Sequence, residues 1–399
     1  MRHPRWIKRP PKKLTAAASV LATLLMTAVV ATQFLQAQTL RTLHAFKGPE
    51  GSYPLASMIR DSAGNLYGTT DLGGNMSCSS GCGTVFKLKA GKLTVLHAFA
   101  GPPNDGANPQ VRLLRNAGGN LYGTTATGGT AGLGTVFEIN ASGTETVLYN
   151  FTGGNDGEYP LGNLVRDKNG NFYSTTSGNG TTTGGTIFKL DTTGKLTTLY
   201  TFTFGTNGSR PTGNLVRDAA GNLYGTCYYT SGIVYKLDMS GTLTVLHTFN
   251  GTDGAHPAGG LIADAAGNLY GTTEQGAQPP YGTVFQIVKT TGAFQILHSF
   301  DGGLVEGGNP DSPLARDLAG NLYGANTAGG GGCHRFGCGT IWKLDTSDHL
   351  TVLTNFGNGN QGKIPRGGVV LDRAGNLYGT TSLAGGGCGQ CGTVFKITP

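Results

Sequence analysis

The chain has 399 residues, of which 69 are glycine and only 13% are charged. Short runs of Thr, Tyr, Val, Leu and Phe lie between Gly, Asn and Asp, which is typical of short strands and tight turns and unlike a helical protein. The glycines follow no three-residue period, so a collagen-like chain is excluded. The net charge of +7 comes mostly from the N-terminal segment, and no basic stripe of the kind that indicates nucleic-acid binding is visible elsewhere.

Residues 1–37 differ from the rest of the chain. Six basic residues precede an apolar stretch of small residues that runs from Leu14 to Ala31, and without these six the chain has 23 basic and 22 acidic residues. Small residues at Ala31 and Ala37 offer cleavage sites, so the segment predicts a secretory signal peptide. The alternative is an uncleaved N-terminal membrane anchor, because the apolar run is close to spanning length. We expect residues 38–399 to be a monomer that is secreted, periplasmic or at the cell surface, with no membrane span after cleavage.

From residue 39 onward the chain is a tandem repeat. The motif Gly-Asn-Leu-Tyr-Gly-Thr-Thr, or a close variant, begins at seven glycines: Gly64, Gly119, Gly170, Gly221, Gly267, Gly320 and Gly375. Each repeat also contains an apolar run that ends in Arg-Asp, a Gly-Thr-Val-Phe-Lys-Leu run and a Leu-His-x-Phe run, or variants of them. Each run is about five to eight residues long and is bounded by turn residues, which predicts a four-stranded antiparallel meander. Seven such units predict an all-β fold, the seven-bladed β-propeller.

The two ends of the array complement each other. Residues 39–46 form a Leu-His-x-Phe run with no partner before it, and residues 392–397 form a third strand with no fourth strand after it. We expect the N-terminal strand to be the outer strand of the last blade, because this closure removes the open edges of a linear array. Leu66 and Phe86 are examples of the apolar residues expected to fill the space between blades.

The repeat Asp-x-x-Gly-Asn-Leu-Tyr-Gly-Thr-Thr, followed by Gly-Thr-Val-Phe-Lys-Leu and Thr-Val-Leu-His-x-Phe, resembles that of the GloVer tandem-repeat proteins. These are exported bacterial proteins with varied surface anchors, hence the description "choice-of-anchor". The resemblance covers residues 39–399 and implies a propeller-like repeat and export, but no particular activity. The chain stops two residues after its last predicted strand, so we expect no carboxy-terminal anchor.

The loops on the two faces of such a ring differ. The turns after the first strand of each blade are nearly uniform, Asp-x-x-Gly-Asn, which favours a structural turn over a ring of cation-binding Asp residues. The loops after the second strand vary from four residues (228–231) to twelve (71–82 and 327–338). Because functional residues collect on loops held by a rigid scaffold, we expect any ligand site on this variable face, around the channel mouth.

Departures from the repeat on the variable face supply the candidate ligand-binding residues. They are Arg210, Tyr228, Tyr229, His256, Glu274, His334 and Arg335. The two tyrosines could stack on a sugar or a peptide, and the others add charge or hydrogen-bonding groups to the same face. The alternative is that all seven are ordinary exposed loop residues.

Six of the seven cysteines lie in the loops after second strands. They form the pairs Cys78/Cys82, Cys333/Cys338 and Cys388/Cys391. In an oxidising compartment such pairs predict local disulfides, although pairing between adjacent blades, a zinc site or a redox motif at Cys388-Gly-Gln-Cys391 are alternatives. Cys227 remains as a buried free thiol. The histidines of the Leu-His-x-Phe runs lie on different blades, so they cannot converge on one metal ion.

The sequence contains no nucleophile elbow, zinc-protease helix motif or phosphate-binding loop. The Asp-Gly loops at Asp105, Asp156 and Asp253 lack the full ligand spacing of a calcium loop. We therefore predict no catalytic residue, metal or cofactor, and no nucleic-acid partner. The favoured interpretation is an exported binding module for an extracellular glycan, peptide or protein. The alternative is an extracellular hydrolase or lyase that degrades a polymer at the channel mouth.

Overall fold

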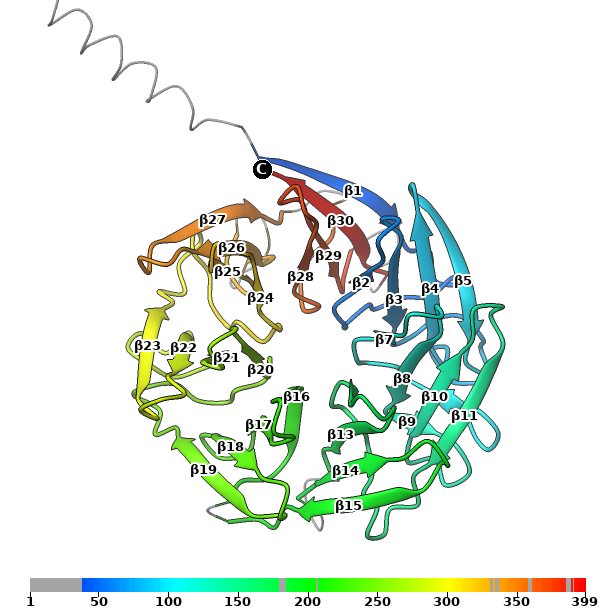
Figure 1. The fold of residues 1–399 in the computed structure, drawn as a ribbon. Coiled ribbons are helices and arrows are strands. Elements are labelled where there is room, and N and C mark those ends of the chain that lie inside the picture. Colours follow the sequence, from blue (N-terminus) through cyan, green and yellow to red (C-terminus); the bar gives the residue numbers. More distant parts are fainter. Residues whose placement is uncertain are drawn as a thin grey trace, which may run out of the picture. The chain divides into compact units, whose positions relative to one another are not determined.

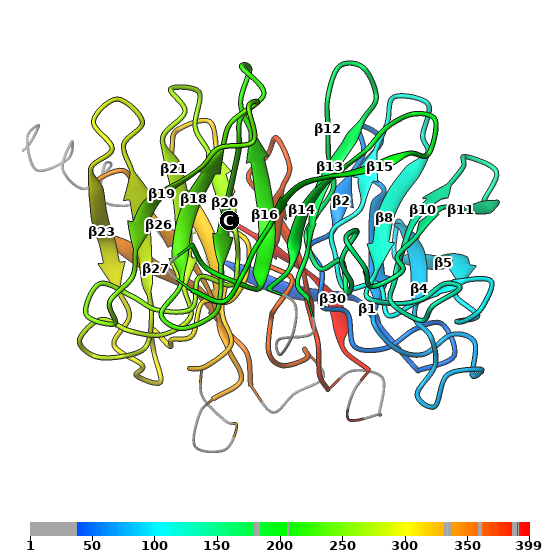
Figure 2. The same cartoon turned by 90° about the horizontal axis from the view of Figure 1, so that it is seen from below.

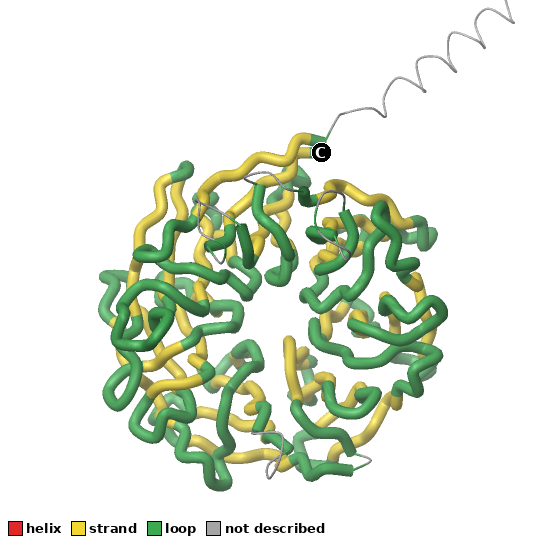
Figure 3. The backbone as a smooth tube through the Cα atoms, turned by 180° about the vertical axis from the view of Figure 1, so that it is seen from behind, coloured by secondary structure: helices red, strands yellow, loops and turns green. Residues whose placement is uncertain are grey.

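The structure, a computed structural model, describes residues 38–178, 184–205, 207–330, 333, 337–357, 361–384, 389 and 391–399. The predicted signal peptide at 1–37 lies outside the described residues and stays a prediction. Residues 39–398 form one compact unit of seven four-stranded antiparallel sheets, arranged as blades around a central channel (Figure 1). The described residues form strands and loops without a helix (Figure 3). The predicted seven-bladed β-propeller is confirmed.

The blades share one strand order from the channel outward. The first strands are β2 (Ile59–Arg60), β7 (Leu114–Arg115), β12 (Val165–Arg166), β16 (Pro211–Arg217), β20 (Leu261–Ala263), β24 (Ala315–Arg316) and β28 (Val369–Leu371). The second strands are β3 (Leu66–Thr70), β8 (Leu121–Thr125), β13 (Phe172–Thr176), β17 (Leu223–Cys227), β21 (Leu269–Thr273), β25 (Leu322–Asn326) and β29 (Leu377–Thr381). The third strands are β4 (Thr84–Lys89), β10 (Thr135–Ile139), β14 (Thr186–Leu190), β18 (Ile233–Leu237), β22 (Thr283–Ile287), β26 (Thr340–Leu344) and β30 (Thr393–Thr398). The outer strands are β5 (Lys92–Ala98), β11 (Glu145–Asn150), β15 (Leu196–Thr201), β19 (Leu243–Thr248), β23 (Phe294–Ser299), β27 (Leu350–Asn355) and β1 (Thr39–Ala45).

The innermost strands are shorter than the sequence predicts. Six of them have only two or three residues, and β16 alone reaches seven. Each has a partner strand on one side only, because its other edge faces the channel. A proline that cannot donate a backbone hydrogen bond precedes six of these strands and is the first residue of β16. A short extra ribbon pairs β6 (Gly106–Ala107) with β9 (Thr127–Gly128) in the loops of blade 2.

The ring closes through the N-terminal strand. β1 pairs with β30 in antiparallel register from Thr39 opposite Thr398 to Ala45 opposite Thr393, and the two strands lie side by side in Figure 1. The backbone N–H of Phe46 extends this contact by donating to the carbonyl of Gly392 at 3.1 Å. The predicted closure is confirmed, so no blade in the ring leaves its third strand unpaired.

The core lies between the blades. At each of the seven boundaries a buried Phe that follows an outer strand packs against a buried aromatic residue of the next blade's third strand, with ring centroids 5.1–5.3 Å apart. The pair Phe46–Phe86 joins the last blade to the first in the same way as the other six. Leu66 and Phe86 belong to one cluster with Phe46 and Val394, so the predicted inter-blade residues of blade 1 face blade 7.

The Gly-Asn-Leu-Tyr-Gly-Thr-Thr motif recurs because each of its positions has a packing role. Leu66 is buried between blades, and Gly68 leaves room for Phe86, whose Cζ would lie 2.6 Å from an added Cβ. Thr70 Oγ1 hydrogen-bonds Thr84 Oγ1 of the third strand at 2.9 Å, so two buried hydroxyls satisfy each other. The motif therefore specifies a blade, not a ligand site.

Candidate functional site

The turns after the first and third strands lie on one face of the ring, here called the uniform face; Figure 2 shows the strands running between this face and the opposite one. In blade 1, Asp61 accepts hydrogen bonds from the backbone N and Nδ2 of Asn65, at 2.8 and 2.7 Å, and from the Tyr67 hydroxyl at 3.1 Å. Five other blades repeat this arrangement with Asp, and blade 2 has Asn116 in its place. Burial opposes ionisation of Asp61, but the hydrogen bonds outweigh it and lower its pKa. These carboxylates are turn elements with their oxygens already bonded.

The opposite face, here called the variable face, carries the loops after the second and fourth strands. In every blade the residue before the loop proline has a positive φ of 53–59°: Tyr53, Asn108, Tyr159, Arg210, His256, Asn309 and Ile364. Its carbonyl accepts a hydrogen bond from the first residue that follows the second strand, as Arg210 does from Tyr228 and His256 from Glu274, both at 3.0 Å. Each blade thus places these two loop residues side by side. The residue before the proline has a backbone conformation that is strained for side chains other than Gly.

Four of the predicted ligand-binding residues come together on blades 4 and 5. The Tyr228 hydroxyl donates to Glu274 Oε2 at 2.9 Å, and the Tyr228 ring lies 4.7 Å from the His256 ring between centroids. The Arg210 guanidinium lies 5.8 Å from the centre of the same Tyr228 ring. Burial, followed by the Glu274 charge, raises the pKa of Tyr228 to about 12, so its hydroxyl stays a hydrogen-bond donor at neutral pH.

The remaining three candidates lie apart from this group or outside the described residues. Tyr229 packs edge-on against Phe204 with centroids 5.6 Å apart, and both side chains are exposed. His334 and Arg335 lie outside the described residues. The group at blades 4 and 5 is therefore Arg210, Tyr228, His256 and Glu274, here called the Tyr228 cluster.

A cavity of about 210 Å³ opens at the channel mouth on the variable face. It is lined mainly by the first and third residues after each loop proline, and all seven blades contribute. Its charged residues are Arg112, Asp311 and Arg366, and Asn163 and Asn214 add amides. These residues do not stand out in the sequence, because only the closed ring gathers equivalent positions of the seven blades around one axis. The signal that could have found them is the fixed offset of one or three residues from each loop proline.

Arg112 is the central cation of the channel. It lines the mouth cavity and two deeper cavities of about 610 and 300 Å³, and Asn214 lines the same three. Arg112 is exposed in the channel, and the protein that surrounds its guanidinium lowers its pKa by desolvation. Within the described part of the chain no acidic side chain is paired with Arg112, and Asn214 Oδ1 is buried without a hydrogen-bond partner. The channel therefore holds an uncompensated positive charge beside a free amide oxygen.

Asp311 connects the channel mouth with the Tyr228 cluster. Its Oδ2 lies 3.7 Å from Nε of Arg366, and its Oδ1 is buried without a hydrogen-bond partner among the described residues. Burial raises the pKa of Asp311 to about 7. The positive charge of Arg366 opposes this rise in pKa, and the negative charge of Glu274 adds to it. Asn309, on the same loop as Asp311, donates to the Glu274 carbonyl at 3.1 Å. The loop that carries Asp311 is thus hydrogen-bonded to the loop that carries Glu274.

The cysteines pair locally where the structure describes both partners. Cys78–Cys82 and Cys333–Cys338 are disulfides within single loops. Cys391 is also disulfide-bonded, and its predicted partner Cys388 lies outside the described residues. Cys227 is a buried free thiol, as the sequence predicts. Among the described residues no helix is long and apolar enough to cross a membrane.

Comparison of the sequence with models of known protein families identifies the family of the repeat. The model of the Gloeobacter/Verrucomicrobia repeat matches residues 28–232 and 228–399. The chain belongs to this family. The expected resemblance is thereby confirmed for this Gloeobacter/Verrucomicrobia repeat protein, and the family description names a repeat without an activity. A comparison with curated proteins gave no match.

Solved structures similar to this Gloeobacter/Verrucomicrobia repeat protein share its fold at low identity. The extracellular domain of a protein described as a hybrid two-component system from B. thetaiotaomicron has 12% identity and a TM-score of 0.59, covering 90% of this chain and 39% of that chain. PorZ, a surface component of the type-IX secretion system of Porphyromonas gingivalis, has 15% identity and a TM-score of 0.55, covering 89% and 47%. The repeat protein thus spans less than half the length of these larger chains, and the likeness shows the propeller fold.

Proposed function

We propose that this protein is an exported binding module that holds an acidic extracellular glycan at the channel mouth of its variable face. The observation that carries the proposal is the Arg112 guanidinium, which stands in the channel without an acidic partner among the described residues. A guanidinium recognises a carboxylate through two parallel charge-assisted hydrogen bonds. A sugar carboxylate that enters from the mouth would supply the missing negative charge.

The lining of the mouth suits a sugar better than an apolar peptide. Asn163, Asn214 and Gln110 present amides to the cavity, and amides donate to and accept from hydroxyl groups. The adjoining Tyr228 cluster adds an aromatic ring, an imidazole, a guanidinium and a carboxylate on the same surface. We infer that the terminal acidic sugar occupies the mouth while the next sugars lie across the Tyr228 cluster.

Export supports an extracellular ligand. The signal-like segment at 1–37 and the disulfides within the variable-face loops both suit an oxidising compartment. Secreted and surface-attached polysaccharides are abundant there, and many carry uronic acids. A rigid ring with loops at its mouth is a suitable scaffold for binding them.

The test is titration of the purified protein with uronic-acid oligosaccharides and with neutral oligosaccharides of the same length, by calorimetry. We expect binding of the acidic series only, and about tenfold or greater weakening by Arg112→Gln. The matched control is Arg373→Gln, because Arg373 is exposed in a uniform-face turn, and it should leave the affinity unchanged. Equal binding of neutral sugars, or equal loss in both variants, would overturn the proposal, and binding of only peptides or proteins would replace the glycan.

A second candidate function follows from Asp311. A carboxyl group with a pKa of about 7 at a cavity mouth can act as a general acid or base near neutral pH. In this alternative the protein is an extracellular hydrolase or lyase acting on the same class of polymer. Incubation with acidic polysaccharides, followed by measurement of new chain ends, tests it, and Asp311→Asn should abolish the turnover. Binding without any chain cleavage would exclude it.

A further inference from the structure

The outer rim of the ring carries a repeated pair of titratable side chains. Four outer-strand histidines contact the acidic residue of the loop that follows: His44–Glu50, His97–Asp105, His247–Asp253 and His298–Glu306. In the boundary between blades 4 and 5, the His247 ring also stacks on Phe294 of the next outer strand, with centroids 3.7 Å apart. The His–acid pair of one blade therefore faces, on the outer strand of the next blade, the position that Phe294 occupies.

One blade breaks the pattern at that facing position. Six blades have an apolar residue there, opposite the last apolar residue of the third strand: Leu40, Leu93, Leu196, Leu243, Phe294 and Leu350. Blade 2 has Glu145, which lies opposite Ile139 in the same register. A carboxylate therefore replaces an apolar side chain beside the pair His97–Asp105.

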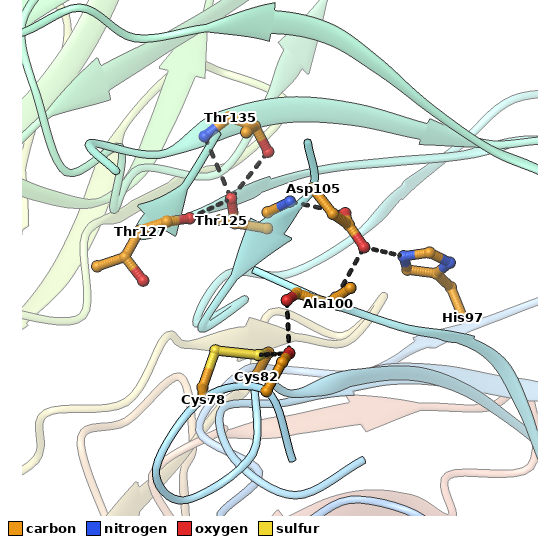
Figure 4. Close-up of polar contacts among 10 residues, drawn as sticks. Cys78, Cys82, His97, Ala100, Asp105, Thr125, Thr127 and Thr135 are labelled. Atoms are coloured by element: carbon orange, nitrogen blue, oxygen red, sulfur yellow. Dashed lines mark hydrogen bonds and ion pairs between the residues drawn. A yellow bond between two sulfur atoms is a disulfide. The ribbon is translucent and has the colours of Figure 1, made fainter. Parts of the chain in front are cut away.

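The three side chains converge. One ligand atom from each of His97, Asp105 and Glu145 lies within 4.8 Å of the other two. His97 Nε2 lies 3.0 Å from Asp105 Oδ2, and Figure 4 shows the imidazole pointing at this carboxylate. Glu145 Oε1 is buried and has no hydrogen-bond partner among the described residues. A buried carboxylate oxygen without a donor beside an imidazole nitrogen indicates a missing positive partner.

The surroundings hold the first two groups in place. Asp105 accepts from the backbone N–H of Ala100 at 2.8 Å and of Gly106 at 2.6 Å. The His97 ring packs edge-on against the buried Phe99 ring, with centroids 4.7 Å apart. The loop at Ala100 is itself tied to the disulfide loop of blade 1, because Ser77 Oγ donates to the Ala100 carbonyl at 2.5 Å. Such supporting contacts are those that orient metal ligands in proteins.

We propose that His97, Asp105 and Glu145 bind a divalent transition-metal ion of the zinc class at the boundary between blades 1 and 2. One imidazole nitrogen and two carboxylate oxygens suit such an ion better than Ca²⁺ or Mg²⁺, which prefer oxygen ligands alone. Tetrahedral bonds of about 2.0–2.1 Å place the ligand atoms roughly 3.3 Å apart. Glu145 therefore moves inward, while His97 Nε2 and Asp105 Oδ2, now 3.0 Å apart, separate slightly. His97 coordinates through a deprotonated Nε2, so a proton on this atom moves to Nδ1 or to solvent. A fourth coordination position remains open to water.

The experiment is titration of the untagged, oxidised, metal-stripped protein with Zn²⁺ by calorimetry, and with Co²⁺ by visible absorption, which reports four-coordinate geometry. We expect one equivalent to bind. Glu145→Leu restores the residue type of the other blades, so it should fold, and it should weaken binding at least about tenfold. Glu145→Gln keeps the side-chain shape and should weaken binding as well. The buried thiol of Cys227 does not compete in the folded protein.

The matched control is His247→Gln, at the boundary where Phe294 takes the place of the glutamate. This variant should bind one equivalent of Zn²⁺ with unchanged affinity and give an unchanged Co²⁺ spectrum. His97→Gln should lose both the Zn²⁺ binding and the Co²⁺ spectrum. Absence of Zn²⁺ binding by the wild-type protein, unchanged affinity in Glu145→Leu, or an equal loss in His247→Gln would each overturn the proposal.

Discussion

On the uniform face, Asp61 accepts three hydrogen bonds from its own turn, and the equivalent residue of every other blade is bonded within its turn as well. On the variable face, Asp311 Oδ1 and Asn214 Oδ1 are buried without partners among the described residues, and Arg112 has no acidic partner there. The Asp or Asn residue that opens each uniform-face turn is thus hydrogen-bonded locally in all seven blades. The variable face gathers unsatisfied groups at one mouth, which is how a site that completes its bonds with a ligand is built.

The largest expected effect comes from breaking the ring that supports both faces. Deletion of residues 38–45 removes β1, leaves the outer edge of β30 unpaired and uncovers the boundary that Phe46 and Phe86 fill. We expect loss of the cooperative folded monomer, or association through the exposed edge. Circular dichroism during heating and size-exclusion chromatography measure this. A monomer with unchanged melting temperature would contradict the closure.

A second change removes one polar network from the uniform face. Asp372→Ala takes away the acceptor of three hydrogen bonds from Asn376 and Tyr378, and we expect a loss of about 2 kcal/mol in unfolding free energy. Asp167→Asn should cost less than about 1 kcal/mol, because blade 2 already uses Asn116 at this position. Chemical denaturation measures both. Equal losses would show that the carboxylate charge, and not the turn, matters.

A third change sharpens the contrast through pH. The folded pKa of Asp311 is raised to about 7 by burial, so its ionisation destabilises the fold progressively as pH rises from about 4 to 7. Asp311→Asn should therefore stabilise the protein by about 1–2 kcal/mol at pH 8 and have little effect at pH 4. Asp372 has the opposite sign: its pKa is lowered, so its contribution is present above pH 4 and is lost as pH falls. Melting temperatures of both variants across pH check these signs.

The smallest expected effect concerns the uniform-face side of the blade boundaries. Arg166 of blade 3 lies over the Tyr122 ring of blade 2 at 5.6 Å, and its Nε donates to the Gly170 carbonyl at 3.2 Å. Arg166→Gln should cost about 0.5–1 kcal/mol. Arg373→Gln, an exposed change on the same face, should cost nothing measurable. An equal loss of stability in both variants would indicate that the net charge, and not the contact of Arg166 with the Tyr122 ring, accounts for the effect.

The fold was predictable because each repeat has the same turn, strand and packing residues. Gly68 and its equivalents, the Asp61 turn and the aromatic pair Phe46–Phe86 are all repeated or complementary in the sequence. The length of the first strands was not predictable. It depends on which edge faces the channel, and this is settled only when seven blades surround one axis.

The site was predictable only in part. Tyr228 and Glu274 depart from the repeat, and the sequence flags such departures. Arg112 and Asp311 occupy positions with no consensus residue among the blades, so the repeat does not mark them as unusual. Only the ring brings them to one mouth. Glu145 lies within 4.8 Å of a histidine of the preceding blade, measured between ligand atoms, and linear spacing does not reveal this.

The pairing of β1 with β30 has a consequence for folding. The two strands lie at opposite ends of the repeat array, and Thr39 pairs with Thr398. The last blade is therefore completed only when the other six blades have brought these two ends together. A partly folded array exposes the unpaired edges of both strands, and such edges promote aggregation.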